Sequence, residues 1–596
     1  MMPGRSAPAS PPGSTSFTAG RLWRSLVVPL AIAAPALYWV SEATRRASLE
    51  TLGRDQGIFQ YVAWALTQGE HDYRDIRDVN GLLTPLIHRV FLALGGADEH
   101  RFRLLDLLVT GTTFAFAGAC LPGVCSRRPP DLLDRAAWGI AAWVTLSAQY
   151  LLYGYWDLAQ RESFCDWFVL GSVALQLVAQ APWLGARAHD GPARQLRLLA
   201  WVGALSLASW FGKPTYALFT VAQIATVWLD RDLLVPRGRA LRAFGLGAAA
   251  CVAVELGLLV AYGDVRAYGR IQLLDVPTMY RFIWPRAAAD IFSTAWNATQ
   301  AIFAIVGAFV LLALVFVRQA PIRLVGVALL PLCALVGVVV QTKAFPYHFH
   351  PVTLGVHLQW LVFAAWLAER ARTAQRRLAL LRLAPVAFGA VVGLRVATSM
   401  EDSPHIRAVW LLWGASTPAA RETREYFARF PEPDYFPYEM RQTAAYLREH
   451  TRPSDRVQVY GMDPYLLFLA RRLSATPYIY AYDLNVDAAL AGGTGGQPDV
   501  EQAERIRALR GAHEEDLVAR LDAHPPAAFV FLDTSPLLTE DDAWDDFRTH
   551  CAAAATWVQG RYRETRRFGH DHVWLRNDIV PADPPADLLV PTESPY

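Results

Sequence analysis

Two lysines stand out in a chain that otherwise uses arginine for its positive charge. Of the 56 Lys and Arg residues, only Lys213, in WFGKPTY, and Lys343, in QTKAFPYHFHPV, are lysines. Lysine carries a compact point charge on a flexible stem, whereas arginine presents a planar fork. A point charge suits a phosphate that gains negative charge as a bond breaks. The alternative is that Lys343 only extends toward a membrane interface.

Four further charged residues lie in polar stretches between apolar runs. They are Asp55 in RDQGIFQY, Asp78 in YRDIRDVNG, and Arg161 and Glu162 in YWDLAQRESF. A charge at bilayer depth costs about 2.5–3.5 kcal/mol, so charges gathered from several spans at one boundary indicate a site. Simpler interpretations exist: Asp55 could cap the helix that follows it, and Arg161 and Glu162 could form an ion pair.

The stretch around Lys343 also contains Tyr347, His348 and His350. The two histidines are two residues apart, a spacing that places both rings on one side of an extended segment. They could bind a metal, although no acidic residue is nearby. They could equally belong to an aromatic belt at a membrane interface.

The composition predicts a membrane protein. The 596 residues are 53% hydrophobic and 18% charged, whereas a soluble domain carries about 25% charged residues. The mean hydropathy is +0.19. The formal net charge of +2 gives no indication of a nucleic-acid partner.

About eleven segments are long and apolar enough to cross a bilayer, which takes roughly 20 residues of helix. They lie near residues 22–41, 103–123, 134–151, 164–184, 195–211, 214–229, 240–262, 296–317, 321–341, 350–368 and 378–397. The fold class we predict is therefore a multi-pass α-helical membrane protein.

Arginine placement predicts the orientation of the spans. Arginines recur in every second loop, at 124–135, 185–197, 230–242, 318–323 and 369–382, and the positive-inside rule makes that side cytoplasmic. The N-terminus then lies inside. The outer loops 42–102, 152–163 and 342–349, together with the 211–214 turn, bring all the candidate residues to one membrane face. We expect the protein in the inner (cytoplasmic) membrane.

Three regions follow from this pattern: a disordered tail at 1–20, a transmembrane domain at 21–397, and an extracytoplasmic domain at 398–596. Within the long first outer loop, 42–102, the run DQGIFQYVAWALTQG predicts an amphipathic helix on the membrane surface. The C-terminal region alternates strands and helices, which predicts a small α/β domain. Its expected strands are 456–461, 475–484, 527–533 and 571–577, and its expected helices are 463–473 and 499–523.

Around the candidate site residues the chain resembles a C-type glycosyltransferase. The similarity lies in GRDQGIFQYVAWALTQGEHDYRDIRDVNGLLTPLIH, DLAQRESF, WFGKPTYAL, KAFPYHFHP and AAYLREHTRPSDRVQVYGMDPYLLFLARRLSATPY. The similarity is strongest with bacterial relatives of protein O-mannosyltransferases and of the lipid A aminoarabinose transferase, which are similar to glycosyltransferase family 39.

The resemblance implies a sugar donor linked to a polyprenyl phosphate and an inverting transfer to an acceptor hydroxyl, which could belong to a protein, a lipid or a glycan. Asp55 would be the general base. No cofactor follows with certainty, and a divalent metal stays open. The donor phosphate would contact Lys343, Lys213, His348 and Arg161, and the other substrate contacts would come from Glu162, Asp78, Tyr347 and His350.

Two alternatives belong to other functional classes. A transporter or flippase of lipid-linked sugars would need access from both sides, and such proteins often show repeated halves, which this chain lacks. A non-catalytic membrane protein with an outer sensory domain would not explain the clustered carboxylates and lysines. An enzyme should bring Asp55, Lys213 and Lys343 to one cavity, so this geometry separates the three hypotheses.

Overall fold

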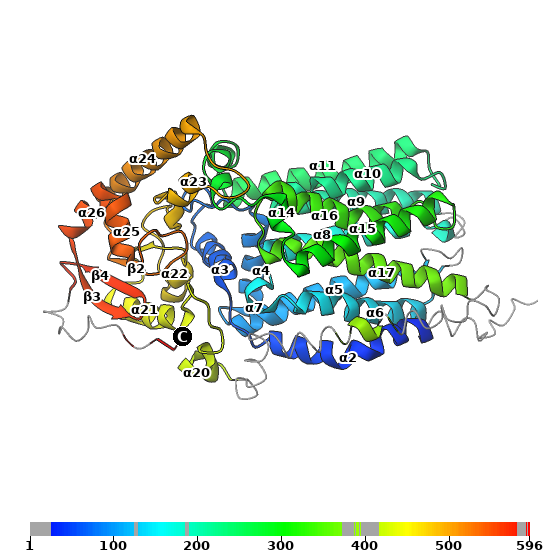
Figure 1. Ribbon diagram of the computed structural model, residues 1–596, viewed down its shortest axis with the longest axis horizontal. Coiled ribbons are helices and arrows are strands. Elements are labelled where there is room, and N and C mark those ends of the chain that lie inside the picture. The colour runs from blue at the N-terminus through cyan, green and yellow to red at the C-terminus, as the bar shows by residue number, and fades with distance from the viewer. Residues whose placement is uncertain are drawn as a thin grey trace, which may run out of the picture.

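The computed structural model describes residues 26–123, 129–184, 190–371 and 417–580, together with the isolated positions 387, 389–392, 394, 592, 594 and 595. Long helices run side by side along the long axis of the molecule. The C-terminal strands and helices gather at one end of this helix bundle (Figure 1). That end is called the capped end below.

Each of the first ten predicted spans coincides with a helix of the bundle. The eleventh, 378–397, lies almost entirely outside the described residues, as does the predicted tail at 1–20. The ten helices are α2 (Val28–Ala47), α5 (Glu99–Cys120), α6 (Leu132–Leu151), α8 (Arg161–Ala179), α9 (Gly191–Gly212), α10 (Ala217–Leu229), α11 (Arg237–Tyr262), α15 (Ala295–Phe316), α16 (Leu324–Gln341) and α17 (His350–Ala371).

Five of the described helices, α5, α8, α11, α15 and α16, are long and apolar enough to cross a membrane. Their burial differs as expected of a membrane bundle. Most of α8 is buried among its neighbours, whereas α11 and α15 are largely uncovered and expose Leu246, Val260 and Phe309. The structure therefore supports a membrane-embedded helical bundle, and the number of eleven spans stays a prediction.

Helices α9 and α11 pack closely because glycines leave room for the backbone of the facing helix. A Cβ atom on Gly203 would lie 2.0 Å from the carbonyl oxygen of Phe244. One on Gly247 would lie 1.7 Å from that of Ala200. Small residues at such contacts let membrane helices approach each other, so larger side chains should force α9 and α11 apart.

Gly247→Ala is expected to lower the stability of the protein by about 1–3 kcal/mol, because the methyl group overpacks a backbone contact. Thermal unfolding of the detergent-solubilised protein measures the change. Gly245→Ala is the matched control, since its methyl group would meet nothing within 4 Å on the same helix. Equal unfolding midpoints for the two variants would contradict the proposed close contact.

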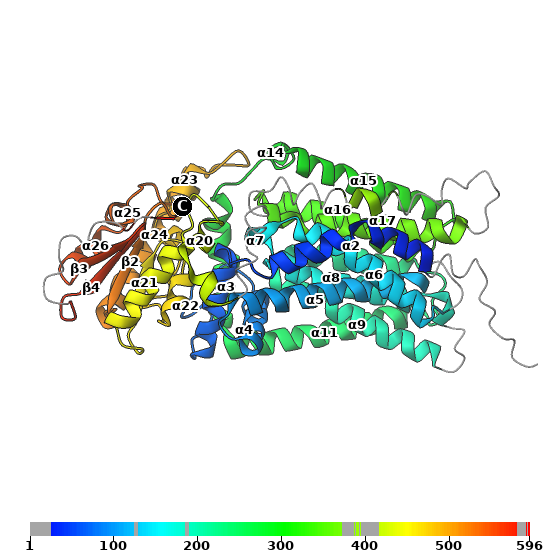
Figure 2. The same cartoon turned by 90° about the horizontal axis from the view of Figure 1, so that it is seen from below.

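Short elements at the capped end connect the long helices. The predicted amphipathic helix is α3, which begins at Arg54. It is covered by the C-terminal region, since Gly57 packs directly against Tyr465, so it does not lie open on a membrane surface. Figure 2 shows α3 and α4 between the bundle and the C-terminal elements. The connecting elements are α3 (Arg54–Thr67), α4 (Leu83–Gly95), α7 (Gly154–Asp157), α12 (Val265–Arg270), the π-helical turn Ile271–Asp275, α13 (Val276–Thr278), α14 (Ala288–Ile291), and the 3-10 turns Pro214–Tyr216, Tyr280–Phe282 and Pro346–Phe349.

A four-stranded mixed sheet forms the core of the C-terminal region, with the strand order β1-β2-β4-β3. Strands β1 and β2 are parallel, and β4 is antiparallel to both β2 and β3. The elements are α20 (Arg424–Phe427), α21 (Pro437–His450), β1 (Val457–Tyr460), α22 (Tyr465–Ala470), α23 (Asp487–Ala491), α24 (Val500–Ala523), β2 (Ala528–Leu532), α25 (Ala543–His550), α26 (Ala552–Gln559), β3 (Tyr562–Phe568) and β4 (Asp571–Arg576).

Three of the four strands expected in this region are confirmed as β1, β2 and β4, and both expected helices are present as α22 and α24. The strand expected at 475–484 is wrong. Pro477 has no N–H to donate to a ladder, Thr476 donates its hydroxyl to Gln458, and the segment ends in a 3-10 turn at Ala481–Asp483. The aromatic side chains that suggested a strand pack into the interior instead.

Candidate active site

A cavity of about 390 Å³ lies at the capped end of the bundle. One wall comes from α3, the start of α8 and the loops near residues 80, 280 and 345, and the roof comes from the C-terminal region. Its lining consists of Arg54, Asp55, Ile58, Phe59, Val79, Asn80, Trp156, Gln160, Arg161, Glu162, Tyr280, Ile283, Trp284, Lys343, Phe345, Tyr347, Glu432, Pro433, Asp434, Met462, Tyr480, Tyr482, Pro536 and Leu537.

Asp55 lines this cavity from the first turn of α3. It does not cap the helix, because Gly53 is the N-cap residue. Burial raises the pKa of Asp55 above its usual value, although the charges of Arg54 and Arg161 and a hydrogen bond from Tyr347 oppose the shift. A carboxylate with a raised pKa in a cavity is suited to accepting a proton.

Arg161 lines the cavity from the first turn of α8, where Asn80 and Asp78 fix its position. Its Nη1 donates to Asn80 Oδ1 at 2.5 Å. Asp78 in turn accepts from the Asn80 side chain at 2.8 Å and from Tyr480 at 3.2 Å. The Arg161 Nε is buried and has no hydrogen-bond partner among the described residues. Asp78 therefore acts on the cavity through its neighbours, whereas Arg161 keeps a donor for a ligand.

Glu162 and Lys213 form a buried ion pair behind Arg161. Glu162 Oε1 accepts from Lys213 Nζ and lies 3.5 Å from Arg161 Nη2. The other oxygen, Oε2, is buried without a partner among the described residues, and Glu162 lines the cavity. Lys213 itself is not part of the lining, so it reaches the cavity only through Glu162.

Lys343 lines the cavity and is held by backbone carbonyls. Its Nζ donates to the carbonyl oxygen of Tyr280 at 2.9 Å and to that of Ile283. Burial lowers the pKa of Lys343 to about 8. His348 lies behind it, with Nδ1 3.0 Å from the Lys343 carbonyl and Nε2 3.6 Å from Glu162 Oε1. Lys343 therefore supplies positive charge to the cavity and also fixes the 280–283 loop.

The two remaining candidates of this stretch lie differently. Tyr347 lines the cavity beside Asp55. His350 lies away from it, because its Nε2 is 2.8 Å from the carbonyl oxygen of Asp157 and its ring lies 3.8 Å from that of Tyr153. The structure thus brings Asp55, Arg161, Glu162, Lys343 and Tyr347 to one cavity and places Lys213, Asp78, His348 and His350 behind its walls.

Sequence reasoning missed Asp157 and Arg54. Burial, followed by the charges of Asp55, Glu432 and Glu162, raises the pKa of Asp157 well above its usual value. Its Oδ1 has no partner among the described residues. Asp157 lies in YWDLAQRESF, four residues before Arg161. Arg54 lines the cavity and donates to Asp463 and Asp434, which are 409 and 380 residues away and so could not be paired with it from the sequence.

The candidate histidine pair does not form a metal cluster with the cavity carboxylates. Within the described ranges, the one group of three histidine or carboxylate side chains whose ligand atoms lie within 4.8 Å of one another is Asp533, Asp542 and His572. These residues belong to the C-terminal region and do not line the cavity.

Aromatic side chains complete the cavity on the side of the roof. Tyr480 and Tyr482 stack with their ring centroids 5.0 Å apart, and Tyr280 lies 5.8 Å from Tyr482. Trp156 and Trp284 also contribute to the lining. Aromatic faces next to a few polar groups are typical of pockets that enclose an organic ligand. The arrangement can hold an anionic group near Arg161 and Lys343 while Asp55 accepts a proton.

Comparison with known proteins gives distant likenesses only. No family model and no curated protein matches the chain. Among solved structures, ArnT from Cupriavidus metallidurans, bound to undecaprenyl phosphate, is 13% identical with a TM-score of 0.49, over 94% of this chain and 99% of ArnT. The oligosaccharyltransferase AglB from Archaeoglobus fulgidus, in complex with an inhibitory peptide and a dolichol-phosphate, is 12% identical with a TM-score of 0.39, over 92% of this chain and 75% of AglB.

Both proteins are C-type glycosyltransferases, the class that the motifs of this chain resemble. At TM-scores below 0.5 and identities of 12–13%, no substrate or residue role carries over from them.

Proposed function

We propose that this protein is a glycosyltransferase that moves a sugar from a polyprenyl-phosphate donor to an acceptor hydroxyl. The observation that carries the proposal is the shared cavity, in which Asp55 faces the same space as Arg161 and Lys343. A base and fixed cations in one partly dry cavity fit a reaction in which a hydroxyl loses a proton while a phosphate departs.

In the proposed reaction the acceptor oxygen attacks the anomeric carbon from the face opposite the phosphate. The bond between that carbon and the phosphate oxygen breaks, and its electron pair leaves with the phosphate. Asp55 accepts the hydroxyl proton. Arg161 and Lys343 stabilise the negative charge that develops on the departing phosphate. Attack from the opposite face inverts the anomeric configuration.

Glu162 is proposed to orient the sugar. Its Oε2 is the buried oxygen without a partner among the described residues, so it can accept a hydrogen bond from a sugar hydroxyl. Lys213 holds Oε1 and so keeps the carboxylate charged and in place. The phosphate roles predicted for Lys213 and His348 therefore become indirect ones in this proposal. The substrate contacts predicted for Asp78 and His350, which also lie behind the walls, become indirect as well.

The proposed membrane placement follows from the positive-inside rule. The arginine-rich loops would face the cytoplasm, and the capped end would face the outer side of the cytoplasmic membrane. The donor lipid would then lie along the bundle with its phosphate at the cavity. Accessibility labelling of a single cysteine introduced in the exposed 539–541 loop of intact cells would test this orientation.

The direct test is release of polyprenyl phosphate by the purified protein in lipid nanodiscs. A panel of polyprenyl-phosphate sugars is offered with pooled protein, lipid and glycan acceptors, and the released lipid phosphate is quantified because it forms whatever the acceptor is. A glycosyltransferase consumes the donor, whereas a flippase would move it across a bilayer intact. The same protein in sealed proteoliposomes reports transport, and transport of the donor without its cleavage would overturn the proposal.

The pH dependence of the transfer rate is expected to be bell-shaped. Asp55 must be deprotonated to accept a proton, so its raised pKa places the rising limb above the usual range for aspartate. Lys343 must be protonated to stabilise phosphate charge, so the rate should fall as pH rises through about 8.

Lys343→Arg separates the two limbs in the same assay, because a guanidinium stays protonated over the whole range. The falling limb should then disappear below pH 10, and the rising limb should stay in place. A falling limb that is unchanged in Lys343→Arg would assign it to a group other than Lys343.

A further inference from the structure

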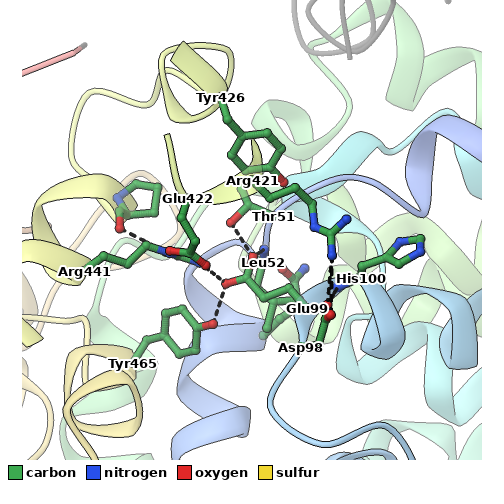
Figure 3. Close-up of polar contacts among 12 residues, drawn as sticks. Thr51, Leu52, Asp98, Glu99, His100, Arg421, Glu422, Tyr426, Arg441 and Tyr465 are labelled. Atoms are coloured by element: carbon green, nitrogen blue, oxygen red, sulfur yellow. Dashed lines mark hydrogen bonds and ion pairs between the residues drawn. The ribbon is translucent and has the colours of Figure 1, made fainter. Parts of the chain in front are cut away.

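One carboxylate joins three parts of the chain next to the cavity. Glu99 is the first residue of α5 and its side chain is only 14% exposed. Around it meet the segment that leads into α3, the start of α5, and helices α21 and α22 of the C-terminal region. Figure 3 shows Glu99 in the middle of these contacts.

The two oxygens of Glu99 point in different directions. Oε2 accepts from the Thr51 hydroxyl at 2.8 Å and from the Leu52 N–H at 3.4 Å. Oε1 accepts from Arg441 Nη2 and from the Tyr465 hydroxyl, both at 2.5 Å. One side of the carboxylate therefore holds the chain just before α3, and the other side holds the C-terminal region.

Thr51 and Leu52 lie immediately before the first turn of α3, which carries Asp55. The carbonyl oxygens of this segment are also held, because Arg103 donates to Thr51 at 2.7 Å and Tyr435 donates to Leu52 at 3.0 Å. These contacts tie the segment to α5, through Arg103, and to the C-terminal region, through Tyr435.

The same C-terminal region also supplies the roof of the cavity. Arg54, directly before Asp55, donates to Asp463 Oδ1 at 2.8 Å and to the carbonyl oxygen of Asp434. Asp434 is part of the roof. The distance between Asp55 and the roof thus depends on how α3 and the C-terminal region are joined, and Glu99 is one point at which both are joined to the bundle.

We propose that Glu99 is a positioning residue, which couples the C-terminal region to the helix that carries Asp55. This inference rests on the proposed function of Asp55. Glu99 does not line the cavity, and the donor contacts of Arg161, Lys343 and Tyr347 come from other elements. Loss of Glu99 should displace the base from the acceptor hydroxyl and leave donor binding unchanged.

The test uses Glu99→Ala and Thr51→Val in the full chain in nanodiscs. Misplacement of a reacting group by about 1 Å can cost about 10²-fold in rate. We therefore expect kcat to fall about 10- to 100-fold, with the donor KM changed less than about threefold. Glu99→Gln, which keeps an oxygen that can accept from Thr51 and Leu52, should retain more activity than Glu99→Ala. Glu422→Gln is the control, because it removes another carboxylate from Arg441 without touching the segment before α3.

Amide hydrogen exchange of residues 48–57, measured without substrate, tests the coupling between the C-terminal region and α3 independently of activity. Exchange there should be at least about tenfold faster in Glu99→Ala and Thr51→Val than in the wild type and Glu422→Gln, because local opening becomes easier. Wild-type exchange and wild-type kcat in both variants would overturn the proposal. A rise in donor KM that matches the loss of rate would also overturn it. If the wild type showed no transfer at all, the proposed function would fail, and the exchange result would still decide the coupling.

Discussion

Replacing Asp55 by asparagine is expected to slow sugar transfer by about 10²- to 10⁴-fold, the range that a general base contributes. Asparagine has the same shape and can still accept a hydrogen bond from Tyr347, but it cannot accept a proton at neutral pH. Asp55→Asn should cost little stability, because burial already disfavours the charged form of Asp55. Initial rates of polyprenyl phosphate release, normalised to the amount of folded protein, measure the effect.

Asp75→Asn is the matched control for this variant. Asp75 lies in the same part of the chain and forms an exposed ion pair with Arg74, but it does not line the cavity, so its loss should leave the rate unchanged. Asp55→Glu, which keeps a carboxylate one methylene further out, should fall between the wild type and Asp55→Asn. A wild-type rate in Asp55→Asn would show that another group accepts the proton.

The helix bundle was predictable from the sequence because the bilayer sets the length of an apolar helix. The strand β3 was not, for a local reason. Its sequence YRETRRF is mostly charged, and an irregularity between Glu564 and Arg566 shifts the register, so the side chains lose the simple alternation that indicates a strand.

For the candidate site, the sequence allowed a prediction of the membrane face on which the residues lie. Arginine-rich loops predict that Asp55, Glu162 and Lys343 share one membrane face, and the structure brings all three to one cavity. The depth of each side chain does not follow from sidedness. Lys213 lies behind Glu162, and Lys343 is held by carbonyl oxygens of Tyr280 and Ile283, in and just after a 3-10 turn that no sequence pattern predicts.

The roof of the cavity could not be predicted either. It comes from loop residues such as Glu432, Asp434 and Leu537, which are 377 or more positions from Asp55 along the chain. Their position depends on tertiary contacts, above all on the bonds of Arg54 and Glu99 to the C-terminal region. A region that the sequence showed only as an α/β domain therefore completes the site.

In the proposed reaction, Arg161 rather than either lysine is the main cation for the departing phosphate. Lys343 already donates to the carbonyl oxygens of Tyr280 and Ile283, so part of its hydrogen-bonding capacity is used by the protein. Arg161 keeps a buried Nε–H without a partner among the described residues. A fixed charge with a free donor is better placed to stabilise an anion that appears only in the transition state.

Arg161→Gln is accordingly expected to lower the single-turnover rate of donor cleavage by about 10²- to 10³-fold, the usual effect of removing one such donor. Glutamine can still reach Asn80 but carries no charge. Arg281→Gln is the control, because Arg281 is exposed and lies over Phe282, outside the lining. Lys343→Met should cost less than Arg161→Gln in this assay. A greater loss of rate in Lys343→Met than in Arg161→Gln would assign the main phosphate role to Lys343. A loss of rate in Arg161→Gln no greater than its loss of folded protein would lead to the same assignment.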